Sequence, residues 1–420
     1  MNVDNAIARY KGYGKGLVLL ARDIEMPKGN FINSIIGPRR AGKTFLMLFY
    51  KNQIDLPDSN KVFINGEDLD FEGIQTDDLD DLERAIFRVY SPDKDKDIYL
   101  FIDEVQNFPS WGRWLRTLFD QHLYRIVVSG STSDLSTDKL PSELRGRSIN
   151  TLVLPYSFKE FCNAKKLDHE KYMSARSTGL LVSGFEEFLK FGGYPLVVAA
   201  DTKDLKTLLM NELYETVLQR DLIEKYSIRK SAVLKAFING MIGSTCRVVS
   251  ARTMTNWLLS QGISISQQSA FKYLEKAQSI FLFFFLYPYS RKPKERNTKP
   301  KLYLPDSGLM RFADQDMSKR LENQVFVELS RRNLKISYYL AQGYEIDFVI
   351  QDGKNVKELI QVCYSLNKPE TYERETKSLL RGSDVLNCNR LSILTFNEER
   401  EIKTEGKVIN VIPAWKWMLL

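Results

Sequence analysis

A glycine-containing segment between an apolar run and an amphipathic run constrains the fold of this chain more than any other feature. It reads Gly37-Pro38-Arg39-Arg40-Ala41-Gly42-Lys43-Thr44 and follows the apolar stretch at 31–36. Glycines at this spacing let the backbone curl, so that its N–H groups and a helix N-terminus face a phosphate. The pattern predicts a phosphate-binding loop (P-loop) whose eight residues contact a nucleotide, within an α/β fold. Lys43 is expected to reach the β- and γ-phosphates.

Two later apolar runs end in polar residues suited to nucleotide hydrolysis. The run YLFIDE ends in Asp103-Glu104, and the run YRIVVSGS ends in Ser129-Gly130-Ser131. We expect Thr44 and Asp103 to hold magnesium and Glu104 to polarise the attacking water as a general base. Ser129 is the predicted sensor of the γ-phosphate, and its neighbour Ser131 is the alternative.

The segment LRGR precedes another predicted strand and offers a candidate arginine. An arginine at a subunit edge can complete a neighbour's site by neutralising the charge of the transition state. We predict this role for Arg147, which implies a homo-oligomer. The alternative is an arginine that pairs with a local carboxylate such as Glu143.

These motifs, in this order, resemble those of AAA+ ATPases. The matching stretches are IIGPRRAGKT, YLFIDEVQNFPSWG, VVSGS, LRGR…LPYSFKEF, FGGYP, QRDLIEKY, YLPDSGL, LENQVFVEL, EIDFVI and IQVCYSL…TYERE. The chain is similar to a group of predicted archaeal and bacterial ATPases with a C-terminal domain of unassigned function. The resemblance implies ATP and Mg²⁺ as ligands, ATP hydrolysis as the activity and Arg147 as the arginine of the family. Ser129 departs from the pattern, because many AAA+ proteins carry Asn there.

The middle of the chain predicts a helical lid followed by a winged helix-turn-helix. Helices are expected at 231–244, 251–260 and 266–277, with Ser266 as an N-cap, and strands at 280–287 and 301–305. Gln267, Gln268 and Lys272 are expected to face a DNA major groove. The basic residues of the wing are expected to grip phosphates, and they are Arg291, Lys292, Lys294, Arg296, Lys299 and Lys301. The alternative is a winged helix that contacts protein.

The stretch EIDFVIQDGKNVKELIQVCYS resembles the metal site of the restriction-endonuclease-like fold. In working nucleases a helix Glu, an Asp and a Glu-x-Lys pair surround magnesium. Glu322 and Asp347 match this pattern, whereas Gln361 and Cys363 replace the Glu and the Lys. A neutral Gln is a poorer ligand for a hard cation, and Cys supplies no positive charge. We therefore predict a degenerate nuclease site that does not cut DNA, with Lys377 or Lys357 as the residues able to replace the missing lysine.

Length and composition complete the prediction. The 420 residues suggest four segments, namely an N-terminal segment (1–30), an AAA+ core with a parallel sheet (31–200), a helical lid with a winged helix (201–308) and a restriction-endonuclease-like α/β domain (309–420). The formal charge of +7 is compatible with a nucleic-acid partner. Four widely spaced cysteines, no signal peptide and no membrane-length apolar run predict a cytoplasmic protein with reduced thiols.

The predicted function is an ATPase that couples its nucleotide state to DNA binding or remodelling. Two alternatives remain open at this stage. One is a slow, nucleotide-gated switch of the STAND kind. The other is a magnesium-dependent nuclease that acts through the C-terminal domain.

Overall fold

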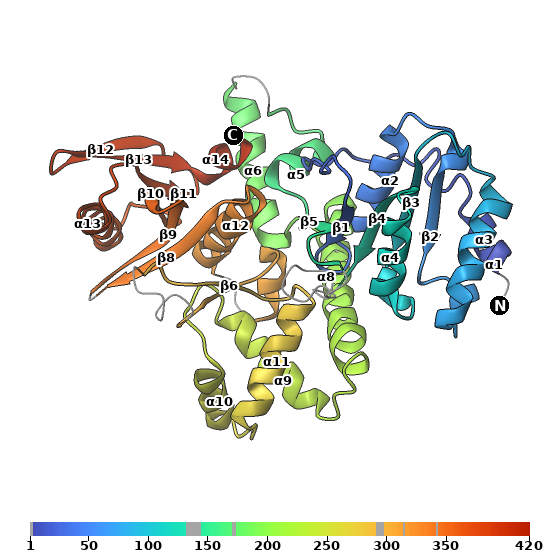
Figure 1. Cartoon of the computed structure of the whole chain (residues 1–420). Helices are drawn as coiled ribbons and strands as arrows, with labels where there is room; N and C mark the ends of the chain where they lie inside the picture. Colours follow the sequence, from blue (N-terminus) through green and yellow to red (C-terminus); the bar gives the residue numbers. More distant parts are fainter. Residues whose placement is uncertain (1–2, 132–143, 170–173, 291–297, 314–315, 342) are drawn as a thin grey trace. The chain divides into compact units, whose positions relative to one another are not determined.

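The computed structural model describes residues 3–131, 144–169, 174–290, 298–313, 316–341 and 343–420 (Figure 1). The chain forms two compact units. The first comprises Met1–Val153 with Ser279–Phe281, and the second comprises Leu154–Gln278 with Leu282–Leu420.

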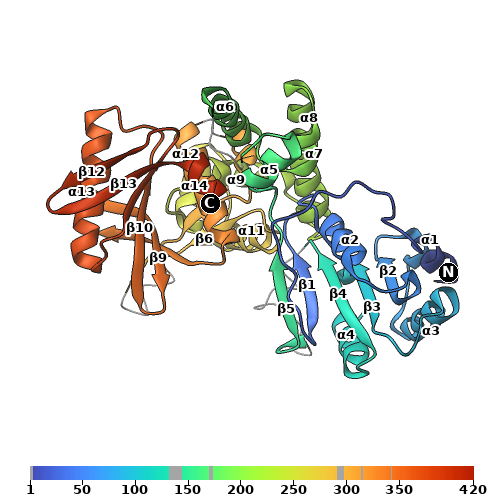
Figure 2. The same ribbon diagram turned by 90° about the horizontal axis from the view of Figure 1, so that it is seen from above.

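The first unit contains a five-stranded sheet in the order β2-β3-β4-β1-β5, in which every pair is parallel (Figure 2). Its strands are β1 (Ile32–Ile36), β2 (Lys61–Asn65), β3 (Ile98–Asp103), β4 (Tyr124–Gly130) and β5 (Ser148–Leu152). The three central strands are almost entirely buried, which explains why they are mainly apolar, although the buried Asn33 and Ser34 interrupt the pattern in β1. The predicted parallel sheet is confirmed.

Helices cover this sheet and connect its strands. They are α1 (Val3–Arg9), α2 (Lys43–Gln53), α3 (Leu79–Tyr90) and α4 (Trp111–Asp120). Leu46 and Met47 of α2 pack into one apolar core with Phe63 and Phe101 of the sheet. The segment before β1 also belongs to this unit, because Arg9 Nη1 lies 2.7 Å from a carboxylate oxygen of the buried Asp68.

The second unit begins with a helical region. Its helices are α5 (Phe158–Lys165), α6 (Ala175–Phe191), α7 (Pro195–Ala199), α8 (Lys203–Thr216) with a π-helical continuation (Val217–Glu224), α9 (Ser231–Gly243), α10 (Ala251–Ser260) and α11 (Gln267–Ser279). The three helices expected at 231–277 are therefore present. Ser266 caps α11 as predicted, because its Oγ accepts a hydrogen bond from Ser269 N at 3.1 Å.

A two-stranded antiparallel hairpin follows these helices. It pairs β6 (Phe284–Leu286) with β7 (Lys301–Tyr303). The strand expected at 280–287 is shorter than predicted. The reason is that α11 runs on to Ser279 and Phe281 has a positive φ of 58°, so the chain turns before it can extend. The segment at 246–249 lies along the other side of β7, with Leu302 N donating to Arg247 O at 3.0 Å.

The second unit ends in a six-stranded mixed sheet in the order β12-β13-β11-β10-β9-β8. Its strands are β8 (Lys335–Ala341), β9 (Tyr344–Asp352), β10 (Asn355–Val362), β11 (Leu391–Thr395), β12 (Arg400–Thr404) and β13 (Lys407–Pro413), and its helices are α12 (Met317–Arg331), α13 (Pro369–Leu386) and α14 (Ala414–Leu419). The short 3₁₀ helix at Ser307–Phe312 precedes α12. The helix, three strands and helix that the sequence predicts here correspond to α12, β8, β9, β10 and α13.

Two further observations concern expectations about the whole chain. The four cysteines are all buried, free thiols. Within the described residues, no helix combines the length and the apolar character that a bilayer crossing requires.

Candidate functional site

The loop between β1 and α2 has the backbone that close approach to a phosphate requires. Gly37 has φ 148°, and a Cβ at this position would lie 2.1 Å from the carbonyl oxygen of Val153, so only glycine fits. Gly42, with φ 97°, is the N-cap residue of α2. Lys43 is only 6% exposed, and its Nζ lies 3.1 Å from the carbonyl oxygens of both Gly37 and Pro38. The lysine ammonium therefore stands inside the curled loop.

One residue that supports this loop was not predicted from the sequence. Arg22 Nη1 donates a hydrogen bond to the carbonyl oxygen of the buried Ala41 at 2.9 Å. Arg22 lies well before the motif, in a part of the chain without a recognisable pattern, so only the folded structure reveals the contact. The predicted Arg39 and Arg40 lie on the loop itself and are half-buried.

The ends of three neighbouring strands bring the predicted magnesium residues together. Because β1, β3 and β4 are adjacent and parallel, their carboxyl ends meet at one edge of the sheet. Thr44 Oγ1 donates to Asp103 Oδ2 at 2.6 Å, and Ser129 Oγ donates to the other Asp103 oxygen. Burial, and then the nearby Glu104 carboxylate, raise the pKa of Asp103. A hydroxyl beside a buried carboxylate at a P-loop fits a hydrated magnesium ion.

Glu104 lies beside this pair, and two donors hold its carboxylate. Its Oε2 accepts hydrogen bonds from Gln106 Nε2 and, at 3.2 Å, from Ser131 N. Glu104 N in turn donates to Ser129 Oγ at 3.1 Å. Ser129 therefore contacts both acidic residues, and its role as a γ-phosphate sensor stays a prediction. Gln106 was not predicted, although its place two residues after the acidic pair is a signal that could have indicated it.

Arg147 lies at the opposite edge of the sheet from the P-loop. It immediately precedes β5, and its carbonyl oxygen accepts a hydrogen bond from Ile32 N, at the amino end of β1, at 2.8 Å. A five-residue strand spans about 17 Å, so Arg147 cannot complete the site of its own subunit. Its Nε lies 3.6 Å from Asp120 Oδ1, and both side chains are exposed. The alternative partner Glu143 lies outside the described residues, and the role in a neighbouring subunit stays a prediction.

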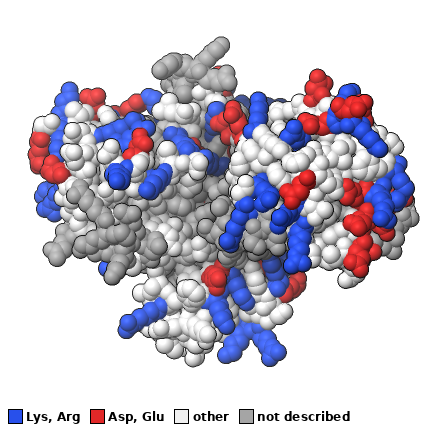
Figure 3. Space-filling view, in the orientation of Figure 1, with Lys and Arg blue, Asp and Glu red and all other residues white. Residues whose placement is uncertain are grey.

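The predicted DNA-contacting residues are only partly within the described structure. Gln267, Gln268 and Lys272 are exposed on the first turns of α11. In the lower part of Figure 3, where Figure 1 shows α9, α10, α11 and the end of the helix that continues α8, the visible charged side chains are mainly Lys and Arg. Four of the predicted wing residues lie outside the described residues, and they are Arg291, Lys292, Lys294 and Arg296. The expectation that Lys301 faces solvent is wrong, because this lysine is 2% exposed.

Lys301 instead enters a group of three carboxylates in the C-terminal domain. Its Nζ lies 3.3 Å from Glu322 Oε1 and 3.3 Å from Asp347 Oδ1, and it also forms an ion pair with Glu345. We call Glu322, Glu345 and Asp347 the acidic pocket. Although burial lowers it, Glu322, Asp347 and Glu345 hold the pKa of Lys301 well above its ordinary value. The cation beside Asp347 thus comes from β7.

The two residues predicted to replace the missing lysine do not do so. Lys377 forms an ion pair with Glu373 on its own helix, and its side chain is 60% exposed. Lys357 is exposed on β10. The sequence could not indicate Lys301, because it precedes the nuclease-like stretch by more than 40 residues and belongs to the predicted wing.

Gln361 and Cys363 are structural in this domain. Gln361 is 3% exposed, accepts a hydrogen bond from Asp347 N at 2.7 Å and donates to Glu375 Oε2 at 2.8 Å. Burial raises the pKa of the Cys363 thiol to about 12, so it is neutral near pH 7. Burial also raises the pKa of Glu375 to about 6. The predicted loss of a metal ligand and of a cation at these two positions stays a prediction.

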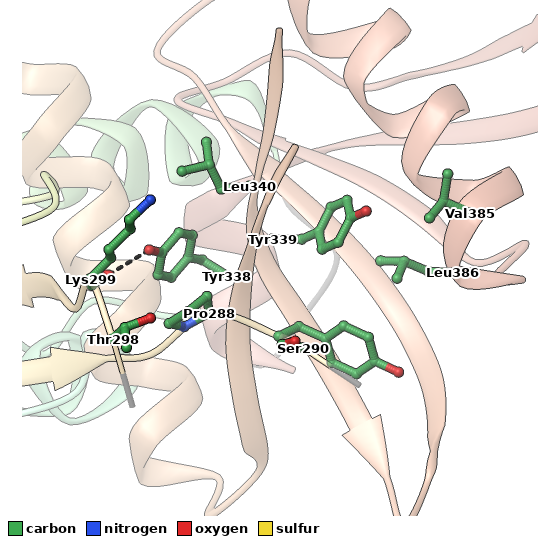
Figure 4. Close-up of a pocket in the computed structure, with 10 residues that line it drawn as sticks. Pro288, Ser290, Thr298, Lys299, Tyr338, Tyr339, Leu340, Val385 and Leu386 are labelled. Carbon is green, nitrogen blue, oxygen red and sulfur yellow. Dashed lines mark hydrogen bonds between the residues drawn. The ribbon is translucent and has the colours of Figure 1, made fainter. Parts of the chain in front are cut away.

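A groove runs beside the edge strand β8. One part has a volume of about 430 Å³ and is lined by Tyr289, Tyr339 and Leu386 among others (Figure 4). A second part of about 920 Å³ shares Tyr289 and Leu386 and adds the exposed Lys335 and Lys354. Of the predicted site residues, the described lining includes only Lys299 of the wing, and it includes none of the three carboxylates of the acidic pocket.

Comparison with known proteins places these features in context. Residues 29–162 match a family model described as an AAA domain, and residues 182–320 match a domain of unknown function, DUF8612. The chain is 33% identical over 415 residues to an uncharacterized protein of Methanocaldococcus jannaschii, an alignment that covers 96% of this chain and 91% of that protein. An uncharacterized protein of Haemophilus influenzae is 28% identical over 404 residues, covering 94% and 96%. Among solved structures, the Walker-type ATPase of Pyrococcus abyssi is similar with a TM-score of 0.39 and 14% identity, covering 67% of this chain and 90% of that one.

Proposed function

Because the chain belongs to the same family as its Methanocaldococcus jannaschii relative and contains an AAA domain, we propose that it hydrolyses ATP and couples its nucleotide state to DNA binding or remodelling. One observation carries the catalytic part of this proposal. Lys43, Thr44, Asp103 and Glu104 converge at one edge of the parallel sheet, with Thr44 and Asp103 in direct contact. A phosphate-binding loop beside two carboxylates is the arrangement that phosphoryl transfer to water requires.

Each of these residues has a distinct task in the proposal. Backbone N–H groups of the loop and the Lys43 ammonium bind the phosphates. Thr44 and Asp103 hold Mg²⁺, which neutralises negative charge on the phosphates when it is bound. Glu104 accepts a proton from the attacking water. Ser129 on β4 donates to the Asp103 carboxylate, accepts from the backbone N of Glu104 and is the proposed sensor of the γ-phosphate. Because different residues bind the phosphates and accept the proton, single substitutions should be able to remove ATP hydrolysis without removing ATP binding.

The DNA part of the proposal is supported by the helical region and the hairpin. Helices α9, α10 and α11 are followed by β6 and β7, which is the element order of a winged helix-turn-helix. Gln267, Gln268 and Lys272 are exposed on the helix that would enter the major groove. The segment between the two strands reads RKPKERNTK and is strongly basic. A basic hairpin beside an exposed helix suits a phosphate grip together with base contacts.

The test is the steady-state ATPase rate of the full chain with Mg²⁺, measured without DNA and with duplex, branched and single-stranded DNA. We expect at least one DNA to raise the rate, and Lys43→Ala to remove activity under every condition. Hydrolysis that no DNA changes, together with no detectable DNA binding, would contradict the DNA part and leave the ATPase part intact.

A second candidate function is a slow switch that changes state when nucleotide binds. The observation in its favour is that Gln106 and Ser131 N both hold the Glu104 carboxylate, so this base has to be released before it can accept a proton. The basal hydrolysis rate of a Gln106→Ala variant distinguishes the switch from the ATPase. A large rise in basal hydrolysis favours a restrained switch, whereas an unchanged rate favours an ATPase whose base is free during turnover.

A nuclease is the third candidate, and the acidic pocket argues against it. Metal-dependent cleavage needs a divalent cation beside the scissile phosphate. The Lys301 ammonium lies between Glu322 and Asp347, the two carboxylates that would hold that cation. We therefore expect no Mg²⁺-dependent DNA cleavage above background by the unmodified chain.

A further inference from the structure

Three carboxylates of the second unit face one another at the junction of α12 and β9. The acidic pocket takes Glu322 from α12 and Glu345 and Asp347 from β9. The side chains of Glu322 and Asp347 are 14% and 15% exposed. Two buried carboxylates that lie close together repel each other and destabilise the folded chain unless a positive charge compensates them. The fold therefore needs a cation at this position.

The chain supplies that cation itself. The side chain of Lys301 is 3% exposed, and its ammonium group makes ion pairs with all three carboxylates of the pocket. The ring of Tyr338 lies on another side, with its centroid 5.6 Å from the Lys301 Nζ. Moving the Lys301 ammonium out of the pocket would be unfavourable, because it would leave buried carboxylates without a compensating charge.

The hairpin that carries Lys301 is fixed to the C-terminal domain on both sides of it. After Lys301, Tyr303 stacks on Phe326 with centroids 4.1 Å apart, and its hydroxyl donates to Glu322 at 2.8 Å. Before it, the Tyr338 hydroxyl donates to the carbonyl oxygen of Lys299, as Figure 4 shows. These contacts fix the chain on both sides of Lys301, so the ammonium group is held in the acidic pocket.

We propose that the acidic pocket is a site for a hard divalent cation that Lys301 occupies with its own ammonium group, so that lysine and metal exclude each other. Carboxylate oxygens are the ligands that Mg²⁺ and Mn²⁺ take in proteins. A divalent ion and an ammonium group within a few ångströms repel each other strongly in a low-dielectric environment. With Lys301 in place, no group of three or more His, Cys, Asp or Glu side chains in the part of the chain that the structure describes is arranged to hold a metal, so the carboxylates would have to close around an ion once the lysine charge is removed. The pocket joins β7 to the C-terminal domain instead of binding metal.

The test is Mn²⁺ binding to the nucleotide-free full chain, measured by the electron paramagnetic resonance of free Mn²⁺ and by thermal unfolding. Lys301→Met keeps the length of the side chain and removes its charge. We expect it to gain one Mn²⁺ site per chain and to unfold several degrees higher with Mn²⁺ than without. Lys301→Met combined with Asp347→Asn should lose both effects. Lys299→Met, an exposed lysine two residues away, is the matched control and should behave like the unmodified chain.

Several outcomes would overturn the proposal. One is Mn²⁺ binding by the unmodified chain that Asp347→Asn removes, because lysine and metal would then coexist. Another is a folded Lys301→Met chain that gains no site. If Lys301→Met does not fold, Lys301→Gln replaces it, since its amide can still donate to the pocket. Folding of either variant only with Mn²⁺ supports the proposal, and failure of both to fold with Mn²⁺ contradicts it. Any Mn²⁺ bound at the P-loop is unaffected by these substitutions, so the result is independent of the proposed ATPase function.

Discussion

At the scale of single residues, phosphate contact and water activation belong to different side chains in the proposed nucleotide site. Lys43 stands inside the curled loop, whereas Glu104 lies at the end of β3, where Gln106 and Ser131 hold its carboxylate. A residue that contacts phosphate in the ground state contributes to affinity, and a residue that takes a proton contributes only during the reaction. Substitutions at the two positions should therefore give different losses.

We predict that Glu104→Gln binds ATP with unchanged affinity and hydrolyses it about 10²–10⁴-fold more slowly, because the amide cannot accept the proton of the water. Lys43→Ala should lose tight ATP binding. Calorimetric titration with ATP and a phosphate-release assay on the same preparations measure the two effects. Hydrolysis by Glu104→Gln at the unmodified rate would show that another residue is the base.

The shifted pKa of Asp306 leads to a second prediction, which concerns the stability of the chain as a function of pH. Asp306 is 1% exposed, and its two oxygens accept hydrogen bonds from Gly193 N at 2.7 Å and Gly308 N at 2.8 Å. Burial raises its pKa from 3.8 to about 6, although these hydrogen bonds and then Arg331 oppose the shift. The folded chain therefore holds the Asp306 proton more tightly than the unfolded chain does.

We predict that the unmodified chain loses stability relative to Asp306→Asn as the pH rises from about 4 to about 6. Below this window Asp306 is protonated in both states, and above it the folded chain carries a buried charge. The unfolding free energy of the unmodified chain should fall, relative to that of Asp306→Asn, by at most about 3 kcal/mol across this range, since each pKa unit corresponds to about 1.4 kcal/mol. Urea unfolding of both chains across this pH range measures it, and a difference independent of pH would contradict the shift.

At the scale of helices and strands, the sequence predicted what local patterns determine. The P-loop and the buried strands β1, β3 and β4 were predictable because spacing and apolar runs are local features. The pairing of Lys301 with Asp347 was not, because these residues lie 46 positions apart and no periodic pattern links them. Arg22 was missed for the same reason, whereas Gln106 lies only two residues after Glu104, and this local position could have indicated it.

Helix α11 carries the prediction about DNA at this scale. Lys272→Ala on this helix should weaken binding to all duplex sequences alike and reduce the slope of log affinity against log salt by about 0.9, which corresponds to one phosphate contact. Gln267→Ala should instead change affinity for some sequences and leave the salt slope unchanged, because an amide that reads bases releases no counterions. Fluorescence anisotropy at several salt concentrations measures both quantities.

The control for this prediction is Lys403→Ala on β12, a lysine whose side chain is 75% exposed at the far edge of the C-terminal sheet. It changes the net charge by the same amount as Lys272→Ala. If the two variants show equal salt slopes, the effect of Lys272 is one of net charge only, and α11 is not the element that contacts DNA.

At the scale of the whole molecule, the position of Arg147 has a consequence for assembly. The P-loop follows the carboxyl end of β1, and Arg147 lies beside its amino end. An arginine on one side of the sheet and a nucleotide site on the other suit a head-to-tail interface, in which each subunit offers the arginine to the next. The exposed pair with Asp120 contributes little stability, so it would not prevent Arg147 from contacting a neighbouring nucleotide.

We predict that Arg147→Ala keeps its affinity for ATP and loses hydrolysis by about 10³-fold, because the arginine neutralises charge only in the transition state. Mixing it with Lys43→Ala chains should restore activity. The Lys43→Ala subunits are inactive themselves but still carry Arg147, so they can complete the intact P-loops of their Arg147→Ala neighbours. Arg125→Ala, at the same edge of the sheet and paired with Asp97 at 3.2 Å, is the matched control and should keep full activity. Phosphate release across a series of mixing ratios measures the rescue, which should peak at intermediate ratios. A mixture no more active than its two components would mean that Arg147 has a structural role within its own subunit.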